Sequence, residues 1–162
     1  MTVREFYVQS RKQELPKFQN VLNALPKDKF AYKPHDRSPS AEQIVWTMTN
    51  ELKSCSDLID TGTLTFEPVP APPPDKMLAL FNQHYDALLH RASKMTDADW
   101  DKPGKFVLGG QVRMEQPIGM FLWMFHHDMI HHRGQLAAYL RPMGGKVPSI
   151  YGPSGDDPGP RG

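Results

Sequence analysis

Proline placement is the feature that most constrains the fold of this chain. Sixteen prolines occur among 162 residues, and most of them gather at residues 68–74 and 142–160. Proline fixes φ and lacks a backbone N–H, so both stretches should be irregular. Regular structure must therefore lie in the segments between the prolines.

Four of these segments have the apolar spacing of amphipathic helices, which bury one face. Thr2 with Glu5, and Ser40 with Gln43, have the spacing of capping boxes at the start of the first two segments. We predict an all-α fold, a four-helix bundle with long proline-rich connections. The predicted helices are residues 3–25, 41–60, 75–95 and 117–140.

Short elements are expected between the third and fourth helices. Residues 96–100 (TDADW) could form a capped turn, and Gly109-Gly110 is a turn signal between apolar flanks, which predicts a small β-hairpin. No repeat indicates a second domain. We predict a single domain over residues 1–152 and a flexible tail over residues 153–162.

Charge, cysteine content and hydropathy exclude several classes of protein. Lysine and arginine number 19 and aspartate and glutamate 18, a balance that argues against nucleic-acid binding through bulk positive charge. The single cysteine, Cys55, excludes an intramolecular disulfide, and its place on an apolar face predicts a buried, inert thiol. No apolar run approaches the roughly 20 residues of a membrane span, and the first residues do not resemble a secretory signal. We expect a cytoplasmic protein with no membrane or nucleic-acid partner and, without a glycine-rich phosphate loop, no nucleotide cofactor.

The most unusual motif is the run HHDMIHH at residues 126–132. On a helix, residues four apart share one face, so His127 lies above His131 and Asp128 lies above His132. Either pair suits a divalent metal such as Zn²⁺, Ni²⁺, Fe²⁺ or Mn²⁺. The motif therefore makes a metal site a hypothesis for the last helix.

Helical phase favours the pair Asp128 and His132. His132 falls within the main apolar stripe and Asp128 at its edge, whereas His127 and His131 point the opposite way, where they could instead line a subunit interface. Bundle sites are built from inward-projecting side chains. A carboxylate in a core is costly unless it is paired or bound to a cation, although a plain Asp128–His132 hydrogen bond would also satisfy it.

Two further residues could complete the site from other helices. Glu51 falls on the inner face of the second predicted helix and His84 on that of the third. Each also has a structural explanation: Glu51 could pair with Arg4, Arg11 or His84, and His84 could be a hydrogen-bonded core residue. The residues alone leave these alternatives open.

Two motifs resemble a known family. HHRGQLAAYLRPMGGKVPSIYGPS, from residue 131 onward, resembles the C-terminal signature of the DinB-like (DinB/YfiT) proteins, and SAEQIVWTMTNE resembles their second-helix motif. The resemblance implies a four-helix bundle with a divalent metal held by three side chains, a histidine from the second helix and two ligands one turn apart on the last. Characterised relatives include thiol-dependent transferases and isomerases. The resemblance also implies a homodimer.

Carrying the resemblance over residue by residue supports one pair and exposes one departure. His132 precedes RGQ and Asp128 lies one turn earlier, as the phase argument predicts. The family's second-helix histidine aligns with Thr47, whose neutral hydroxyl is a poor ligand for Zn²⁺ or Ni²⁺. Glu51 replaces the missing imidazole, or His84 does, or the metal has been lost.

Two functions follow from different classes. The first is a divalent-metal-dependent enzyme of hydrolase or thiol-transferase type that acts on a small molecule. The alternative is a non-catalytic dimeric helical bundle that has lost the metal and serves as a small-ligand-binding or structural module. Thr47 and the methionine-rich surface of the last helix, at Met120 and Met124, favour the alternative.

Overall fold

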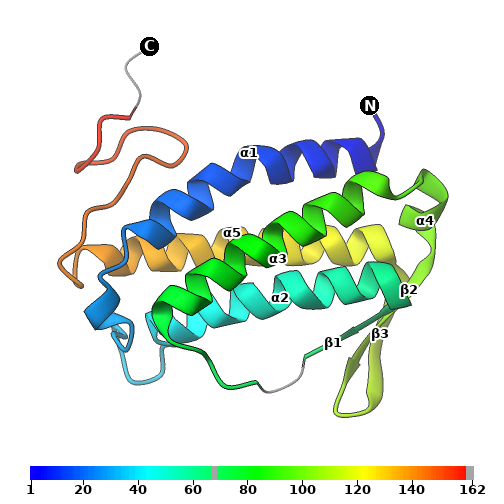
Figure 1. The fold of residues 1–162 in the computed structure, drawn as a ribbon, viewed down its shortest axis with the longest axis horizontal. Helices are drawn as coiled ribbons and strands as arrows, with labels where there is room; N and C mark the ends of the chain where they lie inside the picture. Colours follow the sequence, from blue (N-terminus) through cyan, green and yellow to red (C-terminus); the bar gives the residue numbers. More distant parts are fainter. Residues whose placement is uncertain (67–68, 160–162) are drawn as a thin grey trace.

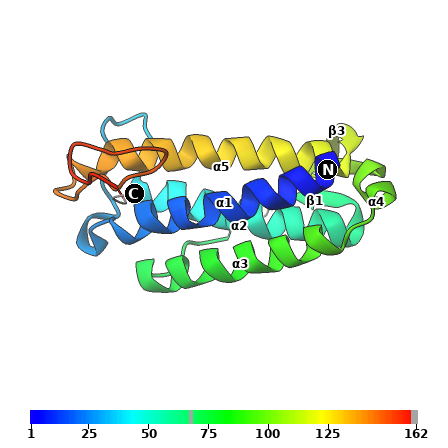
Figure 2. The ribbon, with the colours of Figure 1, turned by 90° about the horizontal axis from the view of Figure 1, so that it is seen from above.

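The computed structural model describes residues 1–66 and 69–159, and four long helices form its body (Figures 1 and 2). All four lie where the apolar spacing predicts them, so the predicted four-helix bundle is confirmed. The four are α1 (Val3–Asn23), α2 (Ala41–Thr61), α3 (Pro74–Lys94) and α5 (Ile118–Leu140).

Local sequence sets the ends of these helices. The side chains of Thr2 and Ser40 each accept a hydrogen bond from the backbone N–H three residues later, and both predicted capping boxes are complete. These bonds satisfy N–H groups that have no partner within the helix. α2 ends at Gly62, whose φ of 75° is a left-handed conformation that glycine adopts without strain.

The helices pack in a ring in which α2 contacts α3 and α5, and α1 contacts the same two helices. α1 and α2 are therefore diagonal to each other, as are α3 and α5. α1 and α5 run in one direction along the bundle and α2 and α3 in the other (Figure 1). The chain must return along the whole bundle between α2 and α3, which is the long proline-rich crossover predicted from sequence; residues 67–68 of it lie outside the described part.

A small sheet lies at the end of the bundle where α5 begins (Figure 1). Its strands are β1 (Thr63–Thr65), β2 (Pro103–Leu108) and β3 (Gln111–Pro117), with β1 parallel to β2 and β2 antiparallel to β3. The predicted hairpin is confirmed, with both turn glycines at positive φ. The predicted capped turn is α4 (Asp97–Asp101), and a 3₁₀ turn, Lys27–Lys29, follows α1. β1 was not expected.

The segment after α5 follows an irregular path that hydrogen bonds fix against the bundle. The Tyr151 hydroxyl donates to Glu14 Oε2 (2.9 Å) and accepts from Arg133 Nη2 (2.7 Å). Further along, the Asp157 carboxylate accepts from the backbone N–H groups of Ser149 and Gly159. The flexibility expected of residues 153–162 stays a prediction, and residues 160–162 lie outside the described part.

Among the described residues, no helix is long and apolar enough to cross a bilayer.

Candidate metal site

Three of the predicted site residues meet between α2 and α5. Glu51, Asp128 and His132 each offer one ligand atom, and these atoms lie within 4.8 Å of one another. Within residues 1–66 and 69–159, they are the only group of three acidic, histidine or cysteine side chains that could hold a metal ion. Helical phase predicted that Asp128 and His132 lie on the inward side of the last helix. The packing of α5 on α2 brings Glu51 to them.

Glu51 is the buried member of this group, with 3% of its surface exposed. Its Oε2 atom is buried and has no hydrogen-bond partner. Burial, together with the hydrogen bond to and the charge of Asp128, raises the pKa of Glu51 to about 9, whereas Arg11 acts in the opposite direction. At neutral pH the Glu51 carboxyl group therefore holds a proton.

A divalent cation fits this arrangement. Two carboxyl groups face each other with one buried oxygen unpaired, and a cation would replace the Glu51 proton and give that oxygen a partner. The set of one imidazole and two carboxylates suits Zn²⁺, Fe²⁺ and Mn²⁺. The three side chains therefore have the chemistry and the arrangement that a divalent metal site needs.

His132 is oriented for ligation by a residue that the sequence analysis did not identify. Its Nδ1 atom lies 2.8 Å from Gln135 Oε1. Because an amide oxygen can only accept, this contact favours the tautomer with the proton on Nδ1 and the lone pair on Nε2. Nε2 lies 3.3 Å from Asp128 Oδ2, at the centre of the group. Spacing could have indicated Gln135, which follows His132 by one helical turn.

The remaining predicted residues lie elsewhere. Thr47, one turn before Glu51 on α2, is exposed, so Glu51 is the α2 residue that reaches the group. His84 lies outside the group: burial lowers its pKa, and the charge of Lys53 lowers it further. α3 is diagonal to α5 in the bundle, which keeps His84 from the donors on α5.

The other histidines of the run separate as the phase argument predicts. His127 and His131 are exposed, and His127 stacks on Trp123 with ring centroids 5.5 Å apart. His126 is buried and contacts Ser10 through its Nε2 (3.0 Å). Cys55 is buried, as predicted, and burial raises its pKa to about 12.

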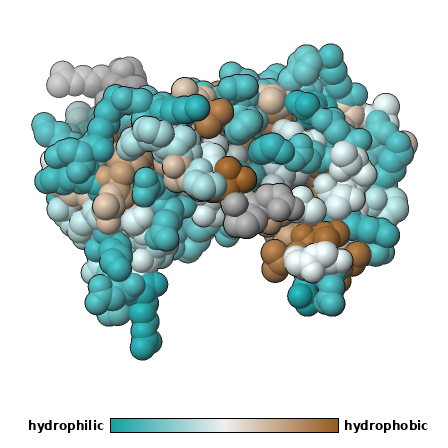
Figure 3. All heavy atoms as spheres, turned by 60° about the horizontal axis from the view of Figure 1, so that its bottom comes forward, coloured by the Kyte–Doolittle hydropathy of each residue, from teal (hydrophilic) through white to brown (hydrophobic). Residues whose placement is uncertain are grey.

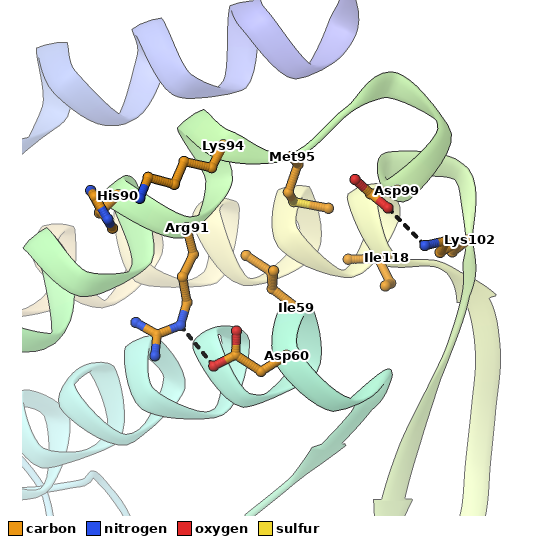
Figure 4. Close-up of a pocket in the computed structure, with 9 residues that line it drawn as sticks. All are labelled: Ile59, Asp60, His90, Arg91, Lys94, Met95, Asp99, Lys102 and Ile118. Carbon is orange, nitrogen blue, oxygen red and sulfur yellow. Dashed lines mark hydrogen bonds and ion pairs between the residues drawn. The ribbon is translucent and has the colours of Figure 1, made fainter.

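A cavity of about 620 Å³ lies away from the donor group, between α2, α3 and α4 (Figure 4). Its charged walls are largely paired with one another: Arg91 contacts Asp60 at 2.8 Å and Lys102 contacts Asp99 at 2.7 Å. None of the predicted site residues lines it. Its size alone does not make it the functional site.

Comparison with known proteins identifies the family of the chain. The DinB family matches residues 1–161. No curated protein sequence matches the chain.

Three solved structures show the same fold. A DinB-like protein from Bacillus cereus has 20% identity and a TM-score of 0.74, covering 91% of this chain and 97% of that one. YfiT from Bacillus subtilis, described as a probable metal-dependent hydrolase with an unusual four-helix bundle topology, has 14% identity and a TM-score of 0.62, covering 87% of each chain. A mycothiol-dependent maleylpyruvate isomerase has 10% identity and a TM-score of 0.62, covering 90% of this chain and 62% of that one.

Proposed function

Because the chain belongs to the DinB family, we propose that it is a divalent-metal-dependent enzyme of hydrolase or thiol-transferase type. The observation that carries this proposal is the meeting of Glu51, Asp128 and His132 around a buried carboxylate oxygen that has no partner. The descriptions of two proteins of the same fold, a probable metal-dependent hydrolase and a mycothiol-dependent isomerase, fit the two reaction types.

Each side chain of the group has a distinct role. Glu51 and Asp128 would supply negative charge for the cation, and Glu51 would give up its proton when the cation binds. Gln135 holds the His132 ring in the tautomer whose Nε2 can ligate. The bound metal would supply Lewis-acid activation of a carbonyl, a hydroxide near neutral pH, or a deprotonated substrate thiol.

Asp128 connects the group to solvent. Its side chain is 46% exposed, against 17% for His132, and it borders a cavity of about 550 Å³ on the outer side of α5. A small molecule in that cavity would therefore reach the group past Asp128. Cys55, the single cysteine, is buried with a raised pKa, so a thiol in the reaction would come from the substrate.

Activity assays on metal-loaded protein test this proposal. We expect Zn²⁺-, Fe²⁺- or Mn²⁺-loaded protein to hydrolyse activated esters or to conjugate a small thiol with an electrophile, and Asp128→Ala and His132→Ala to lose that activity. His131→Ala is the matched control, because His131 lies on the same helix but outside the group. Metal-loaded wild-type protein that fails in both assays, or variants as active as the control, would contradict the proposal.

A second candidate function is a non-catalytic dimeric bundle. It is favoured by the exposed Thr47 at the position of the family's histidine and by exposed apolar side chains near the starts of α1 and α5, such as Phe6 and Met120. It predicts a melting temperature indifferent to chelator and a dimer in sedimentation. A large drop of melting temperature with EDTA would reject it.

A further inference from the structure

The residues that line the cavity beside Asp128 indicate the chemistry of the ligand more closely than the metal group does. Its volume of about 550 Å³ is within the usual size range of small-molecule sites. Its walls come from the residue after β1, from the hairpin β2–β3 and from α5. The lining residues are Phe66, Phe106, Met114, Met124, Phe125, His127, Asp128 and His131.

The cavity and the donor group share one residue. Asp128 lines the cavity and also offers a ligand atom to the group, whereas Glu51 and His132 do not line the cavity. A molecule placed there can therefore direct one end at the cation position and extend away from it over α5. The shared carboxylate fixes which end of the molecule points inward.

The polar lining residues are confined to one wall, which α5 supplies. The polar ones, His127, Asp128 and His131, all come from α5, and the wall supplied by the sheet side is wholly apolar. A sugar or phosphate body would find no hydrogen-bond donor in the side chains of that wall. Figure 3 shows hydrophobic side chains gathered on the protruding hairpin, and this hairpin supplies part of the apolar wall of the cavity.

Aromatic rings make up most of the apolar lining, which comes from the sheet side and from α5. The Phe66 ring meets Phe106 and Phe125 edge to face, with centroids 5.8 and 5.6 Å apart. A further ring extends such an arrangement favourably. Met114 and Met124 add flexible, polarizable side chains that adjust to a flat ligand and make favourable sulfur–ring contacts.

We propose that this cavity is the substrate pocket of the metal site, and that its substrate is a small molecule with an aromatic ring joined by a short linker to an anionic, metal-binding head group. The ring lies against the phenylalanines and methionines, and the head group lies beside Asp128. This inference rests on the proposed function for the head group, but the ring contacts can be tested without metal.

The first experiment uses metal-free protein and benzyl alcohol as the probe. The methyl groups of methionine give separate NMR signals, and titration should shift those of Met114 and Met124 while leaving that of the buried Met77 on α3 unchanged. Absence of shifts at Met114 and Met124 would overturn the inference whether or not the protein binds metal. Shifts caused by protein concentration alone would also overturn it, because a second copy of the chain would then occupy the cavity.

The second experiment uses zinc-loaded protein and two hydroxamates that differ only in the ring. We expect calorimetry to show phenylacetohydroxamate binding about tenfold or more tighter than acetohydroxamate. Met114→Lys should remove this preference and leave zinc binding unchanged, because Met114 is not in the donor group. Val112→Lys is the matched control, since Val112 lies on the same strand, is exposed, and does not line the cavity.

The outcomes separate the two proposals. Equal affinity for both hydroxamates on metal-loaded protein, or a preference that survives Met114→Lys, would overturn the pocket assignment while the metal site stands. Failure to bind zinc, iron and manganese would overturn the proposed function, and the benzyl alcohol titration would still decide whether the cavity accepts an aromatic ring.

Discussion

Among the residues that the structure describes, two glutamates are buried in the bundle, and their partners differ. Glu14 on α1 is 6% exposed and Glu51 on α2 is 3% exposed. Glu14 is paired with Arg133, and it also accepts from Lys17 (2.7 Å) and from the Tyr151 hydroxyl (2.9 Å). Glu51 instead faces another carboxylate.

The partners, and not the depth, decide the charge of each group. Burial alone would raise both pKa values. The hydrogen bonds from Lys17, Arg133 and Tyr151 reverse that effect and lower the pKa of Glu14, whereas Asp128 adds to it and leaves the pKa of Glu51 near 9. Glu14 thus has all the partners that a structural ion pair needs, and Glu51 needs either a proton or a cation.

Replacing each glutamate by glutamine should give the largest contrast. Glu14→Gln leaves Arg133 buried without its charged partner, which should lower the free energy of unfolding by about 3–5 kcal/mol. Glu51→Gln in metal-free protein should change it by about 1 kcal/mol or less, because the native side chain is already neutral. Urea unfolding measures both; equal losses would remove the distinction between the two sites.

The pH dependence of stability should follow Glu51 in metal-free protein. Between its ordinary pKa and about 9, the folded state holds a proton that the unfolded state has released, so stability falls as pH rises, by up to about 1.4 kcal/mol per unit. The window from pH 7 to 8 isolates this effect, because burial lowers the pKa of His126 to about 3 and its destabilising protonation belongs to more acidic solutions. Urea unfolding at several pH values should show this slope in wild type and a flat profile in Glu51→Gln.

Gln135 should affect metal affinity without affecting the fold. Gln135→Leu frees the His132 ring to adopt the wrong tautomer, and loss of such a supporting partner typically weakens metal binding by about 10–100-fold. Gln135→Glu, which keeps an acceptor oxygen, is the matched control and should retain most of the affinity. Equal affinity of the leucine variant and wild type would show that the Gln135 contact is incidental.

Tyr151→Phe should have a small effect that is confined to stability. This change removes the hydroxyl that joins Glu14 and Arg133 but keeps their ion pair, so the free energy of unfolding should fall by about 1 kcal/mol. Metal affinity should not change, because Tyr151 is not part of the donor group. A metal affinity that falls with this variant would connect the two glutamate sites, contrary to the comparison above.

Local patterns predicted most of the fold. Capping residues, apolar periodicity and the Gly109-Gly110 turn act over a few residues, so they give the helices and the hairpin directly. β1 was missed because three residues carry little periodicity and its partner, β2, is distant in sequence. The pairing of Glu14 with Arg133 also joins distant segments and has no local signal.

Local patterns also predicted only part of the candidate site. Helical phase alone separated Asp128 and His132 from the exposed His127 and His131. Deciding between Glu51 and His84 required the packing order of the helices, because α2 contacts α5 and α3 lies diagonal to it. Sequence reasoning placed both residues on inner faces, and which face meets which helix is a tertiary property.

The most direct test of the account is calorimetric titration of Zn²⁺ or Mn²⁺ into metal-free protein at pH 7, repeated in two buffers of different ionisation enthalpy. We expect one cation per chain and release of about one proton, the one held by Glu51. Asp128→Ala should bind about 100-fold more weakly or not at all, and His131→Ala should bind as wild type does. Saturable binding that is unchanged in Asp128→Ala, or no binding to the wild-type chain, would contradict it.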